Sequence, residues 1–245
     1  MPYRRLPTTD KARLRALNAA LKMAEKKGQS KLAFSKPFYD ELLLVKTNFE
    51  NALKQHLSDL KIQSENNKNY KSALEKARIY ISHFIQVVYM TIEREEMKNE
   101  VLKFYGLENF NRKIPALNSE DEIMEWGKRI VEGDHARIQK GGSAIYSPSI
   151  ALVKINLETF HDAAIFQQTL KRNTARSLEK MKEIRKSTNE FISRLWSEIE
   201  ENIKTGLPKH KRQLASEYGI VYIFRRKEKK KLKPEDLQAD LLFEF

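Results

Sequence analysis

Apolar residues recur every three or four positions over long stretches of this chain, and this spacing restricts the fold more than any other feature. The clearest run has seven members: Tyr70, Leu74, Ala77, Ile81, Phe84, Val88 and Ile92. Such spacing places side chains on one face of an α-helix. Only eight Gly and seven Pro occur in 245 residues, so few positions interrupt helices. The sequence therefore predicts an all-α fold of long helices.

A weak internal repeat organises these helices. The segment Phe34–Glu50 ("FSKPFYDELLLVKTNFE") has a counterpart in Tyr146–His161 ("YSPSIALVKINLETFH"), because in both an aromatic–Ser pair precedes a Pro and an apolar stripe. Three further pairs follow in the same order: Ser72–Lys76 with Ser177–Lys180, Phe104–Leu107 with Glu217–Ile220, and Leu117–Ile123 with Leu232–Leu237. The shared order predicts a duplication of about 110 residues, longer than the common solenoid repeats.

Each copy is predicted to form an antiparallel helical hairpin. Short polar segments, Ser64–Asn69 and Lys171–Thr174, divide the apolar stripes of the two copies and are predicted to be the loops. The residues Ser35 and Ser147 are predicted to cap the first helix of each copy, with a Pro in its first turn. Two hairpins side by side predict an antiparallel four-helix bundle.

Further elements flank the copies. A helix is predicted at Asp10–Lys27, with Thr8 or Thr9 as its cap and Gly28 as its end, and a shorter helix at Ser119–Glu132. The apolar runs at 220–224 and 240–245 are predicted to pair as a small C-terminal β-hairpin. One helical domain over 1–245 results, in five segments: a basic N-terminal helix (1–33), the first hairpin (34–107), a connector (108–145), the second hairpin (146–220), and a basic turn with the C-terminal segment (221–245).

Few residue patterns in the sequence are candidates for a chemical site. Two Glu-x-x-His patterns, Glu132–His135 and Glu158–His161, resemble di-metal ligands of helical bundles, but the first is predicted at a Gly-broken helix end and the second at a bundle edge. We therefore predict no metal site and no cofactor. His56 continues an apolar stripe and is predicted to be buried and hydrogen-bonded. No catalytic residue is predicted, and the chain contains no cysteine.

The net charge of +13 is concentrated at the two ends of the chain. Residues 1–36 hold ten basic and two acidic residues, and the stretch from Arg225 to Lys233 holds seven basic residues and one acid. Such asymmetry favours attraction to a polyanion, although it also promotes solubility. The candidate phosphate-binding residues are the following: Arg4, Arg5, Arg225, Arg226, Lys227, Lys229, Lys230, Lys231 and Lys233, with Arg13 and Arg15 as further contacts. The alternative is that the lysines protect an apolar strand from edge pairing.

These observations predict a non-enzymatic structural or protein-interaction protein that acts through its helical surfaces, with a homo-oligomer or a protein partner. The alternative is a nucleic-acid-associated module that binds phosphates through its basic ends, and a metal-dependent bundle enzyme is the third hypothesis. No secretory signal and no membrane span are recognised, so a cytoplasmic location is expected. No small-molecule ligand is predicted.

Overall fold

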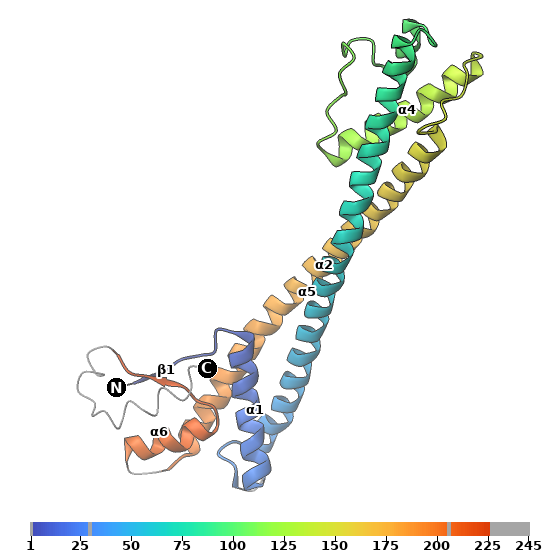
Figure 1. The fold of residues 1–245 in the computed structure, drawn as a ribbon. Coiled ribbons are helices and arrows are strands. Elements are labelled where there is room, and N and C mark those ends of the chain that lie inside the picture. The colour runs from blue at the N-terminus through green and yellow to red at the C-terminus, as the bar shows by residue number, and fades with distance from the viewer. Residues whose placement is uncertain (1, 29–30, 205–206, 226–245) are drawn as a thin grey trace. The chain divides into compact units, whose positions relative to one another are not determined.

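The structure is a computed structural model in which residues 2–28, 31–204 and 207–225 are described. This part of the chain is mostly helical, which confirms the predicted all-α class (Figure 1). The elements follow one another in this order: β1 (Tyr3–Arg4), α1 (Asp10–Lys27), α2 (Lys36–Glu93), the 3₁₀ helix η2 (Asn99–Val101), α3 (Leu102–Tyr105), α4 (Glu120–Gln139), α5 (Ile150–Asn202), α6 (Pro208–Glu217) and β2 (Tyr222–Ile223). Among these residues, no helix is long and apolar enough to cross a membrane.

The two loops predicted within the copies are wrong. Helix α2 runs without a break through Ser64–Asn69, and α5 runs through Lys171–Thr174. Neither segment contains Gly or Pro, so nothing in the backbone ends the helix there. Most of these polar residues are exposed on the helix surface, and Asn66 lies against α5, where its amide donates a hydrogen bond to Gln167 Oε1 at 2.9 Å. The hairpins predicted within each copy are therefore not formed, and α2 pairs with α5.

The chain divides into two compact units, which we call unit 1 (1–57 and 176–245) and unit 2 (58–175). In unit 1, α2 and α5 run antiparallel, since Glu41 contacts Arg194 whereas His56 lies beside Ser177. The core of unit 1 joins α1, α2, α5 and α6 and includes these buried side chains: Leu17, Leu42, Phe191, Trp196 and Tyr218. The predicted helix Asp10–Lys27 is confirmed residue for residue, with Thr9 accepting a hydrogen bond from Ala12 N at 3.2 Å and Gly28 as C-cap.

Unit 2 contains its own antiparallel pair of α2 and α5 segments, because the Tyr70 ring lies 6.3 Å from that of Phe160 while Asn66 contacts Gln167. Helices α3 and α4 cover this pair and share its core, which includes Phe84, Tyr105 and Trp126. Helix α4 begins one residue after the predicted start, with Ser119 as its N-cap in a capping box with Glu122, and it continues beyond the predicted end to Gln139. The prediction that the helix breaks at Gly133 is wrong. A glycine stands there because the backbone of Phe104 leaves no room for a side chain.

A strand pair joins the N-terminal segment to residues 222–223 of the run predicted to form a C-terminal hairpin. Strand β2 pairs antiparallel with β1, so that Tyr3 faces Ile223 and Arg4 faces Tyr222 (Figure 1). The predicted partner segment, 240–245, lies outside the described residues, as does the repeat match at 232–237. The predicted helix start at Ser147 is also shifted, since α5 begins at Ile150, whereas α2 starts with Pro37 in its first turn as predicted.

Candidate nucleic-acid interface

The β1–β2 pair brings the two basic ends of the chain together within unit 1. Beside the paired residues, Arg5 N donates a hydrogen bond to Val221 O at 2.9 Å, and Arg225 follows four residues later. Arg5 and Arg225 are both exposed. The remaining residues of the predicted cluster (Arg226, Lys227, Lys229, Lys230, Lys231 and Lys233) lie outside the described part of the chain.

Arg4 holds the strand pair onto α5. Its Nη1 donates a hydrogen bond to Ser197 Oγ at 3.1 Å and lies 3.3 Å from Glu200 Oε2. The Tyr222 hydroxyl donates to the same Glu200 carboxylate, and burial together with this hydrogen bond raises the pKa of Tyr222. Arg4 is thus already paired with an acid, whereas Arg5 is directed to the surface. Of the two N-terminal arginines, Arg5 is the better placed for a phosphate.

Positive charge is strongly partitioned between the units. Unit 1 contains 29 basic and 17 acidic residues, a net charge of +12, whereas unit 2 contains 17 basic and 16 acidic residues, a net charge of +1. Nearly all of the net charge therefore belongs to the unit that contains both ends of the chain. A field concentrated in this way attracts polyanions and accelerates their association.

Helix α1 adds a basic stripe to this surface. Four cations lie on its exposed side at spacings of four, seven and four residues: Lys11, Arg15, Lys22 and Lys26. The spacing places them along one line of the helix. Asn18 lies within the same line, and the neighbouring Glu25 is the one acid of this face in α1. The spacing of these cations can be recognised in the sequence, but the sequence-based prediction named only Arg15 of the stripe, together with Arg13.

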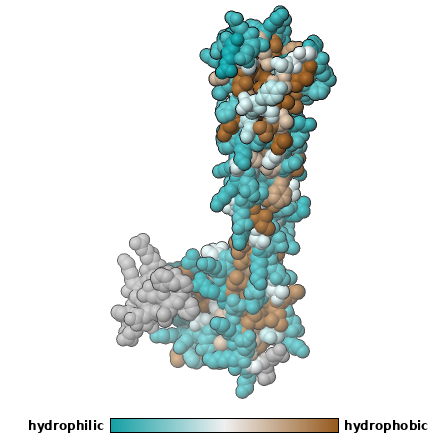
Figure 2. Space-filling view, turned by 45° about the vertical axis from the view of Figure 1, so that its right-hand side comes forward, coloured by the Kyte–Doolittle hydropathy of each residue, from teal (hydrophilic) through white to brown (hydrophobic). Residues whose placement is uncertain are grey.

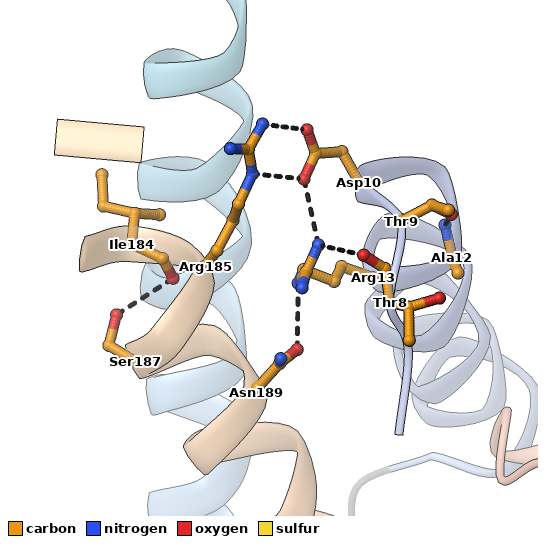
Figure 3. Close-up of polar contacts among 9 residues, drawn as sticks. All are labelled: Thr8, Thr9, Asp10, Ala12, Arg13, Ile184, Arg185, Ser187 and Asn189. Atoms are coloured by element: carbon orange, nitrogen blue, oxygen red, sulfur yellow. Dashed lines mark hydrogen bonds and ion pairs between the residues drawn. The ribbon is translucent and has the colours of Figure 1, made fainter. Parts of the chain in front are cut away.

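Arg13 is buried in the attachment of α1 to α5 and cannot contact a phosphate, so that prediction is wrong (Figure 3). Its Nε donates to Asn189 Oδ1 at 2.9 Å, and its Nη1 donates to Thr8 O at 3.2 Å and Asp10 Oδ1 at 3.1 Å. Asp10 in turn accepts two hydrogen bonds from Arg185. These contacts fix the orientation of α1 and hence the direction in which its outer stripe points.

A second surface feature of unit 1 is a groove of about 590 Å³ between α2 and α5, lined by both polar and apolar side chains. Amides and hydroxyls line much of it, among them Asn48, Gln55, Ser177 and Ser187, and Lys180 supplies its charge. The predicted buried histidine, His56, is close by in sequence and lies 3.1 Å from Ser177 Oγ through Nδ1, which confirms the prediction of a hydrogen-bonded core residue.

The Glu-x-x-His patterns lie on exposed helix faces. Glu132 and His135 point outward from α4, while His161 lies 3.8 Å from the adjacent Asp162 on the surface of α5. Within residues 2–28, 31–204 and 207–225, no three acidic or histidine side chains are grouped as ligands of one metal ion.

Large apolar side chains also remain exposed on the long helices, and Figure 2 shows brown apolar areas among the teal polar ones. In unit 1 these side chains include Leu44 and Leu57, and in unit 2 they include Ile62, Ile155 and Phe166. The Phe166 side chain is 52% exposed, and that of Ile155 is 57% exposed. Exposed apolar residues of this size on a helical surface favour contact with another protein.

Compared with known proteins, the chain matches no family model, no curated protein and no solved structure.

Proposed function

We propose that this chain is a non-enzymatic nucleic-acid-binding protein whose unit 1 binds the phosphate backbone. The observation that carries the proposal is the β1–β2 pair, which brings the N-terminal segment with Arg5 alongside the segment that ends at Arg225, on a unit with a net charge of +12. Lysine and arginine contacts to phosphates release counterions and supply affinity that does not depend on sequence. A protein that binds in this way needs a fixed basic surface and no catalytic group.

The experiment is a titration of fluorescent 20-base-pair DNA and RNA duplexes, and of single strands of the same length, at several NaCl concentrations. Binding through phosphates predicts that log K falls linearly with log salt, with a slope of about −0.9 for each duplex phosphate contact. The variant Arg5→Glu with Arg225→Glu should bind about tenfold or more weakly at low salt. Absence of binding by the wild-type chain at 50 mM NaCl would refute the proposal.

The second candidate function is protein interaction through the helical surfaces, and the exposed apolar residues of α5 favour it. A homo-oligomer or a protein partner would cover them. Light scattering over a range of protein concentrations tests self-association, and Ile155→Ser with Phe166→Ser should abolish any oligomer found. A monomer at all concentrations would leave a different protein as the partner, to be sought by cross-linking.

The two units are further proposed to be copies of one scaffold, as the sequence repeat predicted, with a revised correspondence. In unit 2 the order is α2, α3, α4 and α5, and in unit 1 it is α5, α6, α1 and α2, with the chain ends between α6 and α1. Helices α3 and α6 end alike, each with a buried tyrosine followed by a glycine at positive φ: Tyr105–Gly106 and Tyr218–Gly219. Segment 1–33 then corresponds to the connector 108–145. This correspondence does not depend on the predicted hairpins or on the predicted four-helix bundle.

A further inference from the structure

Helices α1 and α4 occupy equivalent places in their units, and their residues correspond with a constant shift of 110. Both helices follow a hydroxyl N-cap, Thr9 in one and Ser119 in the other. Six buried positions of α1 coincide with buried positions of α4: 13 with 123, 16 with 126, 17 with 127, 20 with 130, 23 with 133, and 24 with 134. The two helices therefore present equivalent outer faces to solvent.

At three positions of these equivalent outer faces the charges are opposite. Where α1 exposes Lys11, Arg15 and Lys22, α4 exposes Asp121, Glu125 and Glu132. Because the helices bury equivalent positions, packing within the units does not require either set of charges. Acids serve solubility at least as well as bases, so a need for solubility does not account for a stripe of basic residues on α1. The sign of the stripe therefore indicates a partner of opposite charge.

We propose that the stripe Lys11, Arg15, Lys22 and Lys26 is the principal element that contacts the nucleic acid, and that its partner is a double helix. This inference rests on the function proposed above. With a rise of 1.5 Å per residue, the stripe extends over about 22 Å, along which a duplex carries about thirteen phosphate charges. Helix α1 contains no aromatic residue on which unpaired bases could stack, so it suits a duplex backbone better than single strands.

The attachment of α1 makes the stripe a rigid element. The Asp10–Arg185 and Arg13–Asn189 contacts fix its first turns on α5, and Ala16 and Ala19 pack closely against Gly219 after α6. The flexible stems of Lys11, Lys22 and Lys26 can therefore reach phosphates without any change in the fold.

The chain provides its own matched control for a test. An exchange variant carries Lys11→Asp and Lys22→Glu in α1 together with Asp121→Lys and Glu132→Lys in α4, so its net charge stays at +13. A half variant carries the two α1 changes alone, and a neutral variant carries Lys11→Gln and Lys22→Gln. All four positions are exposed, and each new acid in α1 is the residue that α4 carries at the equivalent place. Circular dichroism and thermal unfolding verify the fold of each variant.

The affinity for a 20-base-pair duplex is measured from 50 to 200 mM NaCl. We expect the half and exchange variants to bind about tenfold or more weakly than the wild type, and the neutral variant to lose about two units of log–log salt slope. An exchange variant that binds like the wild type would show that net charge, and not the stripe, drives binding, and this would overturn the inference while the proposed function stands. Tighter binding to single strands than to duplexes would overturn the choice of partner. A wild type that binds neither form contradicts the proposed function itself.

Discussion

Arg185 holds Asp10 through two parallel hydrogen bonds, from Nε to Oδ1 at 2.8 Å and from Nη2 to Oδ2 at 2.7 Å (Figure 3). The pair joins the first residue of α1 to α5, and Arg13 adds a third hydrogen bond to the same carboxylate. Bidentate contacts of this kind are stronger and more directional than single ion pairs. The pair therefore sets where α1 begins on the surface of unit 1.

This contact predicts a stability that depends on acid pH. The hydrogen bond from Arg185 lowers the pKa of Asp10 below its usual value of 3.8, so the folded state favours the ionised carboxylate. Its stabilisation is complete above about pH 5 and is lost as the pH falls through the lowered pKa. The variant Asp10→Asn should lose about 1 kcal/mol of unfolding free energy at pH 7 and much less near pH 2. Urea unfolding at both pH values measures this, and an equal loss at both would contradict it.

A buried charge network in unit 2 gives a second prediction. Asp134 Oδ1 accepts hydrogen bonds from the Tyr105 hydroxyl at 2.7 Å and from Arg137 Nη2 at 2.7 Å, and all three side chains are buried. The variant Asp134→Ala leaves the Arg137 charge without its partner and should cost about 3–5 kcal/mol. Denaturant unfolding of Asp134→Ala provides the measurement.

The matched control replaces both charges, as Asp134→Leu with Arg137→Met. Asp134 Oδ2 is buried without a hydrogen bond within the described residues, so the wild-type network is incompletely satisfied. The double variant should therefore unfold with a smaller loss than Asp134→Ala alone, despite two substitutions. A larger loss of unfolding free energy in the double variant than in Asp134→Ala would mean that the network stabilises unit 2 by more than the pairing of Asp134 with Arg137.

The sequence predicted helices well because their signals are local. The cap at Thr9, the end at Gly28 and the stripe of α1 all lie within the helix or next to it, and the predicted bounds were correct. The same holds for Ser119 at the start of α4. The predicted end of α4 was wrong because glycine usually favours a helix end. At position 133 the glycine is instead required by the close approach of the Phe104 backbone, which no local pattern reveals.

The central loops were misjudged because polar composition was taken as a break. Gln63, Asn66 and Tyr70 continue the spacing of three and four, and only their pairing across to α5 accounts for polar residues on that face. The candidate nucleic-acid interface depends on a contact between residues still farther apart in the sequence, the pairing of β1 with β2. No feature of Tyr3 or Arg4 predicts that their strand pairs with residues 222–223, so the sequence could locate two basic ends but could not join them.

Two glycines of α4 test the distinction between a breaker and a packing residue. A Cβ added at Gly133 would lie 2.3 Å from the Phe104 carbonyl oxygen, whereas one at Gly127 would meet the side chain of Leu157 at 2.5 Å. Alanine gains about 1 kcal/mol over glycine in a helix, and only a severe clash reverses that gain. Gly133→Ala should destabilise by about 2 kcal/mol or more beyond Gly127→Ala, because a backbone cannot rotate away as a leucine tip can. Thermal unfolding of the two variants measures the difference, and equal melting temperatures would contradict it.

The polar contact between the long helices in unit 2 predicts opposite effects of single and double substitutions. Gln167 is 3% exposed and accepts the hydrogen bond of Asn66, so Asn66→Leu alone leaves a buried amide without its partner and should cost about 1–3 kcal/mol. Asn66→Leu with Gln167→Leu extends the apolar face that continues at Tyr70 and Phe160 and should be more stable than the wild type. A double-mutant cycle by urea unfolding gives the coupling energy. If the double variant is less stable than either single variant, the polar pair is required for the packing of α2 on α5 within unit 2. If it is more stable, the pair lowers stability, and hydrogen exchange of the backbone amides at positions 66 and 167 should slow in the double variant.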